Sequence, residues 1–204
     1  QALGVSIPTV SRALKDSPEI SRELCAKAKA LAKEMNYRPN PFAMSLRKNA
    51  PRIIGVVVPD IVTHFFASIL NGIENMAIAN GYFVIITTSH ESYEHEKRNI
   101  ENLVNMRVEG IIACLSQETT DFSHISALKD INMPLILFDR VCLTDQFSSV
   151  IADGAQSAQM ATQHLLDNGS KRVAFIGGAN HLDIVKRRKH GYLEALRENR
   201  IPIE

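Results

Sequence analysis

The chain has 204 residues, of which 45% are hydrophobic and 22% charged, so it is long enough for one large domain or for a small domain joined to a larger one. It has no apolar run of about 18 residues and no secretory signal pattern, which predicts a cytoplasmic protein without a membrane span. Cys25, Cys114 and Cys142 are odd in number, widely spaced and set in apolar surroundings, which indicates reduced core thiols rather than disulfides or a zinc site.

The charge is distributed unevenly along the chain. The overall formal charge is +1, but residues 1–52 carry 10 Lys/Arg and 4 Asp/Glu, a balance of +6. The remaining residues carry 13 basic and 18 acidic side chains, a balance of −5. A basic module joined to a mildly acidic one predicts a polyanionic partner for the first.

The first expected element is a short helix within "VSIPTVSRAL", Val5 to Leu14. Ser6 is the expected N-cap, Pro8 fits the first turn, and Val10 and Leu14 are expected to face inward. The residues left on the outside are Ile7, Thr9, Ser11 and Arg12.

The glycine before this helix, Gly4, suits the tight turn of a helix-turn-helix, a motif that presents its second helix to the major groove of DNA. Arginine pairs with guanine through two hydrogen bonds, and Thr and Ser hydroxyls suit phosphates or base edges. Spacing alone also fits an ordinary amphipathic helix with a serine cap, so DNA binding is one of two interpretations at this point.

A second helix is expected in "SRELCAKAKALAKEMNY", with Ser21 as its N-cap. Its apolar stripe consists of Leu24, Ala28, Leu31, Ala32 and Met35. The next segment, "YRPNPFAMSLRKNAPR", has three prolines bracketing about two possible helical turns, which indicates a linker.

From Ile53 onward, apolar runs alternate with amphipathic segments. The runs "IIGVVVP", "YFVIITT", "GIIACL", "PLILFD", "SVIAD" and "RVAFIGG" are typical of buried strands. Helical spacing is found in residues 65–80, 92–106, 122–131 and 156–168. The alternation predicts an α/β fold, a parallel sheet with helices on both faces, whose ligand crevice lies at the carboxyl ends of the strands.

Polar and aromatic side chains follow two of these strands. In "DIVTHFF" one of two adjacent aromatic rings can cover an apolar sugar or base face, and His64 is expected to be a solvated loop residue. In "LFDR" a carboxylate precedes a guanidinium, which suits sugar hydroxyls; the alternative is a surface ion pair that contributes little. The candidate residues at this edge are Asp60, Thr63, Phe65, Phe66, Asp139 and Arg140.

Enzymatic motifs are missing from the sequence. There is no P-loop, no "GxSxG", no "HExxH" and no Cys/His spacing for a metal, and "IGGAN" lacks the full dinucleotide fingerprint. The sequence therefore predicts a non-enzymatic protein without a cofactor.

Five segments, in this order and at these separations, resemble the LacI/GalR (lactose repressor) family of bacterial transcription regulators. They are "VSIPTVSRALKDSPEISRE", "MNYRPNPFAMSLR", "IIGVVVPDIVTHFFASILNGIE", "RVEGIIACLS" and "RVAFIGG". The resemblance implies a helix-turn-helix head in residues 1–38, a hinge helix in 39–51 and an effector-binding core of two subdomains in 52–204. In this comparison the first helix of the head is largely absent and the second subdomain is incomplete, so the sequence is expected to be part of a longer protein.

The resemblance also assigns roles to residues. It makes the helix expected within Val5 to Leu14 the recognition helix, with Ile7, Pro8, Thr9, Ser11 and Arg12 on DNA. It places Ala43, Leu46 and Arg47 of the hinge at the minor groove, with Leu46 as a wedge between base steps; the alternative is that Leu46 packs on the core. It places Arg188 of the basic run "KRRKHGYLEAL", with the six candidate residues of the sheet edge, on the ligand, and leaves Lys186, Arg187 and Lys189 in solvent. Thr63 and His64 depart from the Asn-Pro pattern of the family.

The sequence therefore predicts a homodimeric or larger regulator that binds double-stranded operator DNA. A small molecule, expected to be a sugar, changes the closure of the core and hence the affinity for DNA. The alternative is a sugar-binding protein of the periplasmic type with no role at DNA.

Overall fold

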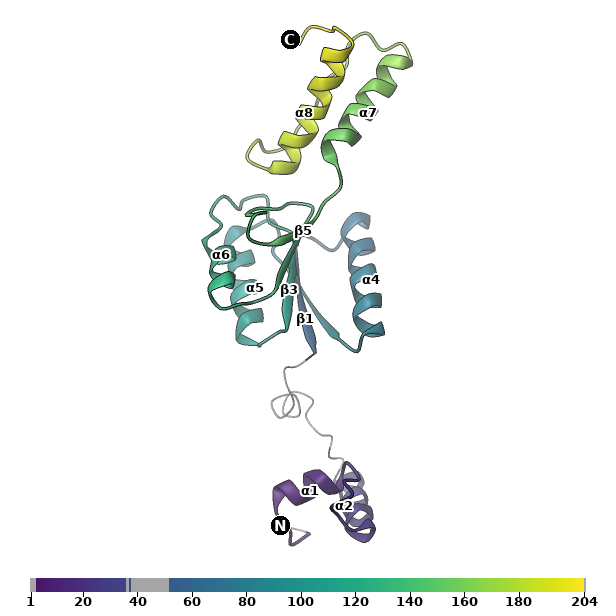
Figure 1. The fold of residues 1–204 in the computed structure, drawn as a ribbon, viewed down its shortest axis with the longest axis vertical. Helices are drawn as coiled ribbons and strands as arrows, with labels where there is room; N and C mark the ends of the chain where they lie inside the picture. The colour runs from purple at the N-terminus through teal and green to yellow at the C-terminus, as the bar shows by residue number, and fades with distance from the viewer. Residues whose placement is uncertain (1–2, 36, 38–51, 204) are drawn as a thin grey trace. The chain divides into compact units, whose positions relative to one another are not determined.

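The computed structural model describes residues 3–35, 37 and 52–203. The chain divides into two compact units, Gln1–Asn49 and Ala50–Glu204. The described residues of the first unit form helices α1 (Ile7–Ala13) and α2 (Arg22–Glu34) (Figure 1).

Helices α1 and α2 begin at the expected caps. The Ser6 hydroxyl accepts a hydrogen bond from the backbone N–H of Thr9 at 3.4 Å, and the Ser21 hydroxyl accepts one from that of Leu24 at 3.3 Å. Gly4, ahead of α1, has a φ of +60°, a backbone conformation in which glycine carries no steric penalty. Local sequence signals therefore set the start of each helix.

A small core holds the two helices together. Ala13, Cys25 and Ala28 are buried, with the partly buried Leu3, Leu14 and Ile20 packed against them. Val10 and Leu14, expected to face inward, are only half-buried, because the short side chain of Ala13 takes the central position. The expected inward position of Met35 is wrong: it is the C-cap of α2, lies beyond the last helical residue, and is 68% exposed.

The second unit contains a five-stranded parallel sheet in the order β2-β1-β3-β4-β5, as the sequence predicts. The three central strands each pair with a neighbour on both sides, and the first and last strands of this order form the two edges of the sheet. The strands are β1 (Ile53–Val58), β2 (Phe83–Thr88), β3 (Gly110–Ala113), β4 (Leu135–Phe138) and β5 (Ser148–Val150).

Helices lie on both faces of the sheet, with α4 on one face and α5 and α6 on the other (Figure 1). All four predicted helices form within two residues of their expected starts. The helices of this unit are α4 (His64–Ala79), α5 (Tyr93–Asn105), α6 (Ser123–Asp130), α7 (Gly154–Asp167) and α8 (Asp183–Glu198).

Each face of the sheet has its own apolar core. On the α4 side, Phe66 and Leu70 pack with Val56, Val58 and Phe138. On the other side, side chains of α5 and α6 pack against the strands; the buried members there include Ile100, Leu103, Ile125, Leu128, Val57, Ile111 and Leu137. These two cores fix the sheet and therefore the loops at its carboxyl edge.

The predicted strand in "RVAFIGG", residues 172–178, is wrong: this segment has no strand structure. Ile176, expected to be buried, is 97% exposed. A β-strand exists only through hydrogen bonds to a neighbouring strand, and no described strand pairs with this segment. An apolar run can therefore predict a strand that does not form, because the run says nothing about whether a neighbouring strand is available.

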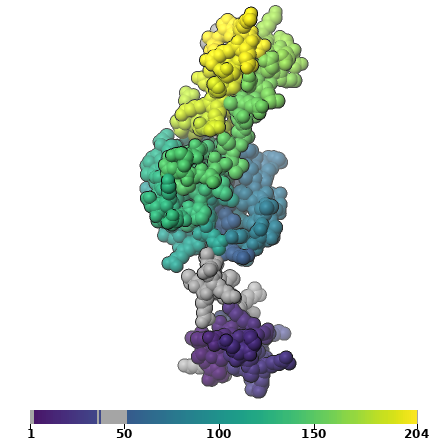
Figure 2. Space-filling view, viewed as in Figure 1, coloured from purple at the N-terminus to yellow at the C-terminus, as the bar shows by residue number. Residues whose placement is uncertain are grey.

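Helices α7 and α8 pack closely against each other, and their atoms meet on the face that Figure 2 shows. Cys25, Cys114 and Cys142 are free and buried, as predicted, and burial raises the pKa of the Cys114 and Cys142 thiols to about 12.

Within the described residues, every helix is too short or too polar to cross a membrane.

Candidate functional site

The outer surface of α1 carries the side chains predicted to meet DNA. Ile7 is 85% exposed, and Pro8 and Arg12 are exposed too. The hydroxyl of Thr9 lies 2.8 Å from that of Ser6, so part of its hydrogen-bonding capacity is used in the helix cap. Ser11 is half-buried. The exposed part of this helix is therefore apolar at its start and cationic one turn later.

Arg12 makes an ion pair with Glu19 at 3.1 Å, and both side chains are more than 60% exposed. Exposed pairs of this kind contribute little free energy, so Arg12 can exchange Glu19 for another acceptor at small cost. Among the described residues, Lys15, Arg22 and Lys33 have no ion pair. The unit thus offers unneutralised positive charge to a polyanion.

The hinge residues predicted at the minor groove, Ala43, Leu46 and Arg47, lie outside the described residues.

The carboxyl edge of the sheet holds the other candidate site. The chain crosses from β2 on one side of β1 to β3 on the other, so β1 and β3 form the point at which strand order reverses, where open α/β sheets bind ligands. Asp60 follows β1, and its carboxylate accepts a hydrogen bond from the backbone N–H of Val62 at 3.0 Å. Thr63 is the N-cap of α4, and no side-chain bond occupies its hydroxyl at the cap.

The two adjacent aromatic residues at this edge have different environments. Phe66 is 6% exposed and packs edge-on against Phe138, with ring centroids 6.4 Å apart. Phe65 is 50% exposed and contacts Phe66 edge-on at 5.1 Å. Phe65 is therefore the ring that can cover a ligand, and Phe66 supports it from the core. His64 is exposed as expected but is the first residue of α4 rather than part of a loop.

Asp139 follows β4 with a φ of +58°, in the left-handed region that Asp tolerates better than most residues. Its backbone N–H donates to the carbonyl of Val150 at 3.1 Å, which fixes the turn. Burial raises the pKa of the Asp139 carboxyl, and the positive charges of Arg140 and Arg188 oppose that rise. The carboxyl is half-buried and lies within the electrostatic range of both arginines.

Arg140 pairs with Glu91 and not, as the alternative interpretation had it, with its neighbour Asp139. Its two Nη atoms donate to the Glu91 carboxylate at 2.6 and 2.9 Å, and Nη1 also donates to the carbonyl of Leu115 at 3.2 Å. Glu91 accepts a further bond from the backbone N–H of Gln117 at 2.7 Å. This arrangement joins the loops that follow β2, β3 and β4.

The pKa values of this pair follow from their contacts. Burial by itself would raise the pKa of Glu91, but the hydrogen bonds from Arg140 and the Gln117 N–H outweigh it and hold the pKa below its ordinary value. Burial would lower the pKa of Arg140, but the bond to Glu91 outweighs it and raises that pKa. Both groups are therefore charged at neutral pH.

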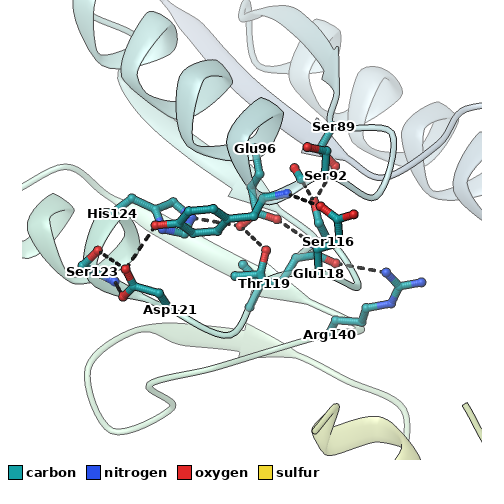
Figure 3. Close-up of polar contacts among 12 residues, drawn as sticks. Ser89, Ser92, Glu96, Ser116, Glu118, Thr119, Asp121, Ser123, His124 and Arg140 are labelled. Carbon is teal, nitrogen blue, oxygen red and sulfur yellow. Dashed lines mark hydrogen bonds and ion pairs between the residues drawn. The ribbon is translucent and has the colours of Figure 1, made fainter. Parts of the chain in front are cut away.

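A buried polar network supports the loop that follows β3 (Figure 3). Glu96 of α5 is fully buried and accepts hydrogen bonds from the Ser116 N–H and, at 2.9 Å, from the Thr119 hydroxyl. His124 Nε2 lies 2.9 Å from the same carboxylate. The Ser116 hydroxyl donates to that of Ser89 at 2.7 Å. Neither Glu96 nor Glu91 stands out in the sequence, because their partners are 20 or more residues away along the chain.

Arg188 is an exposed residue of α8, as are Lys186, Arg187 and Lys189. Arg187 is held by Asp183 of the same helix, with Nε 2.5 Å from the carboxylate. The segment before α8 contacts the loop after β3, where His181 Nε2 lies 2.7 Å from the Gln117 carbonyl. Among the described residues, no three His, Cys, Asp or Glu side chains gather in a way that would hold a metal ion.

Two family comparisons cover almost the whole chain. Residues 1–40 match the family described as "Bacterial regulatory proteins, lacI family". Residues 52–204 match "Periplasmic binding proteins and sugar binding domain of LacI family". The chain belongs to the LacI family. The resemblance drawn from the sequence motifs is confirmed.

Individual LacI-family proteins resemble the chain over nearly its full length. Catabolite control protein A of Priestia megaterium is 32% identical over 204 residues, covering 98% of this chain and 60% of that protein. The lac repressor dimer bound to operator and the anti-inducer ONPF is 26% identical with a TM-score of 0.75, covering 98% of this chain and 60% of that one. The chain thus spans about 60% of the length of these relatives.

A further solved relative contains a phosphorylated ligand. It is the Cra transcriptional dual regulator from Pseudomonas putida in complex with fructose 1-phosphate, 26% identical with a TM-score of 0.68, covering 72% of this chain and 54% of that one. Membership of the LacI family therefore does not predict whether a ligand is a free sugar or a charged sugar phosphate.

Proposed function

We propose that this protein is a DNA-binding transcription regulator, acting as a homodimer or larger homo-oligomer, whose operator affinity changes when a sugar binds at the carboxyl edge of its sheet. The observation that carries the proposal is the presence in one chain of an exposed, capped and cationic helix α1 and of a polar sheet edge at the strand-order reversal. The proposal includes a location in the cytoplasm, where DNA is accessible, and no enzymatic activity.

In this proposal residues 1–38 bind DNA, residues 39–51 form a hinge and residues 52–204 bind the effector. The effector contacts are Asp60, Thr63, Phe65, Asp139, Arg140 and Arg188, with Phe66 behind Phe65. A ligand that binds one closure state of the core more tightly than another shifts the population of states, and the hinge transmits the shift to α1. The match of residues 1–40 to regulatory proteins favours this function over a purely sugar-binding one.

The test has two stages. Duplexes selected by the intact protein from a random library give the operator, and a thermal-shift screen against free sugars and nucleosides gives the ligand. Fluorescence anisotropy then measures operator affinity with and without that ligand. Selection of no common sequence, or an operator affinity that no binding ligand alters, would refute the proposal.

Arg12→Ala should lose discrimination at one operator position by about 1–3 kcal/mol, the scale of a bidentate base contact. The physical reason is that the exposed guanidinium can leave Glu19 for a guanine edge. Anisotropy titrations against the operator and its single-base variants measure the effect. Lys33→Ala, which removes an exposed cation of α2, serves as the matched control and should show no position-specific loss. Equal weakening by Arg12→Ala on all duplexes would limit Arg12 to phosphate contacts.

Asp139→Asn should weaken effector binding by about 1.5–3 kcal/mol, the scale of hydrogen bonds to a charged group. Asparagine is chosen because, like Asp, it tolerates the positive φ at this position. Since burial raises the pKa of Asp139, the wild-type affinity should fall on acidification beginning above the ordinary value of 3.8, and the variant should lose this dependence. Calorimetric titration across pH measures both. An unchanged affinity in the variant would remove Asp139 from the effector site.

A further inference from the structure

The candidate charged groups at the carboxyl edge of the sheet have a negative balance. They comprise three carboxylates, Asp60, Glu91 and Asp139, and two guanidinium groups, Arg140 and Arg188, and the Glu91 carboxylate is paired with Arg140. They act on one another electrostatically: Asp60 on Glu91, and both arginines on Asp139. An anionic ligand therefore meets a site without net positive charge, and each cation already has a carboxylate within range.

Arg140, the more buried of the two cations, is already paired. Both of its Nη atoms donate to the Glu91 carboxylate, and one of them also donates to the Leu115 carbonyl. The Arg140 side chain is 18% exposed, so water screens this pair only in part. Two parallel charge-assisted bonds are the strongest geometry available to an arginine and a carboxylate.

Moving the Glu91 carboxylate out of this position would break several hydrogen bonds and so cost free energy. Its carboxylate also accepts the Gln117 N–H, so displacement by a phosphate would deprive that backbone group of its partner. His90 and Glu91 both have a positive φ, 52° and 62°, which is uncommon for residues other than glycine and persists where surrounding contacts hold the backbone. The carboxylate is therefore a fixed part of the sheet edge rather than a displaceable counter-ion.

Sugar hydroxyls suit this arrangement better. A hydroxyl both donates and accepts, so it can donate to Asp60, Asp139 or the outer lone pairs of Glu91 and accept from a free guanidinium N–H. The half-exposed ring of Phe65, which contacts Phe66, provides an apolar surface on the helix that follows β1. Binding of this kind leaves the Glu91–Arg140 pair in place.

We propose that the effector is an uncharged polyhydroxylated sugar and that Glu91 is the residue that discriminates against its phosphate esters. This inference rests on the proposed function and names the chemical class that the same site takes. The carboxylate of Glu91 both neutralises Arg140 and repels an approaching phosphate.

The test compares each free sugar with its own ester by calorimetric titration of the intact protein. The pairs are ribose and ribose 5-phosphate, glucose and glucose 6-phosphate, and fructose and fructose 1-phosphate. In the pair that binds best, the free sugar should bind about 10- to 100-fold more tightly than the ester, the equivalent of one lost charge-assisted interaction. In Glu91→Gln this ratio should shift toward the ester by about tenfold or more, because Arg140 is no longer neutralised.

Glu94→Gln is the matched control, since it removes the same charge from an exposed position three residues away and should leave the ratio unchanged. A wild-type preference for the ester would overturn the inference and leave the proposed function standing. A ratio unaffected by Glu91→Gln would overturn the role of Glu91. If no sugar or ester binds or alters operator affinity, the proposed function fails and the inference with it. The wild-type comparison is decisive even if the variant does not fold.

Discussion

Replacing Glu96 by alanine should destabilise the protein by about 3–5 kcal/mol, the scale seen when a buried charged partner is removed. The carboxylate is fully buried and accepts from the Ser116 N–H and the Thr119 hydroxyl, with His124 Nε2 also in contact. Alanine leaves these groups buried without an acceptor. His124 Nδ1 already has no partner among the described residues, so the ring would be left with no hydrogen bond.

Urea denaturation of the wild type and variant measures the change in free energy of unfolding. Glu94→Ala is the control, because this side chain lies on the same helix but is exposed, and its loss should change stability by less than about 0.5 kcal/mol. A similar small effect of Glu96→Ala would mean that water or a rearranged loop satisfies the three donors. The loop that Glu96 holds leads directly to Gln117, so destabilised variants should also bind the effector more weakly.

The elements of the fold were predictable where the signal is local. A serine cap needs only the N–H three residues on, which is why Ser6 and Ser21 marked the starts of α1 and α2. Apolar runs indicate strands, and five of the six predicted runs form strands. The expected burial holds for β1 and is wrong for β2, which is at most half-buried, and for β5, which is exposed. The sixth, residues 172–178, shows the limit: a run records burial preference, whereas a strand also requires a hydrogen-bonding neighbour.

The site was predictable only in part, for the same physical reason. Strand ends mark where a ligand crevice lies, so Asp60, Asp139 and Arg140 could be singled out as candidates from the sequence. Glu91 is 49 residues from Arg140 along the chain, and nothing near it in the sequence distinguishes it from a solvated acid. Adjacent aromatic residues on a helix point in different directions, and sequence alone does not say which one faces the core. The structure separates Phe65 from Phe66.

Gly191→Ala should cost about 3 kcal/mol in stability, the upper part of the range for overpacking. A Cβ at this position of α8 would lie 1.9 Å from the carbonyl oxygen of Ala155 in α7. The obstacle is backbone, so rotation of a side chain cannot relieve it and the two helices must separate. Alanine otherwise favours a helix by up to about 1 kcal/mol over glycine, so a net loss identifies the contact between α7 and α8 as its cause.

Gly72→Ala provides the matched control, because Gly72 lies within α4 and a Cβ there meets nothing within 4 Å. This variant should be unchanged or more stable by up to about 1 kcal/mol. Arg188 of α8 lies close to α7, since its Cγ would be 3.4 Å from a Cβ built on Gly154. Separation of the two helices should therefore also displace Arg188 and weaken sugar binding. Thermal unfolding and calorimetric titration of the two variants test both effects. If Gly191→Ala proves as stable as Gly72→Ala, the α7–α8 contact adjusts freely, and the position of Arg188 is then set by something other than this close approach.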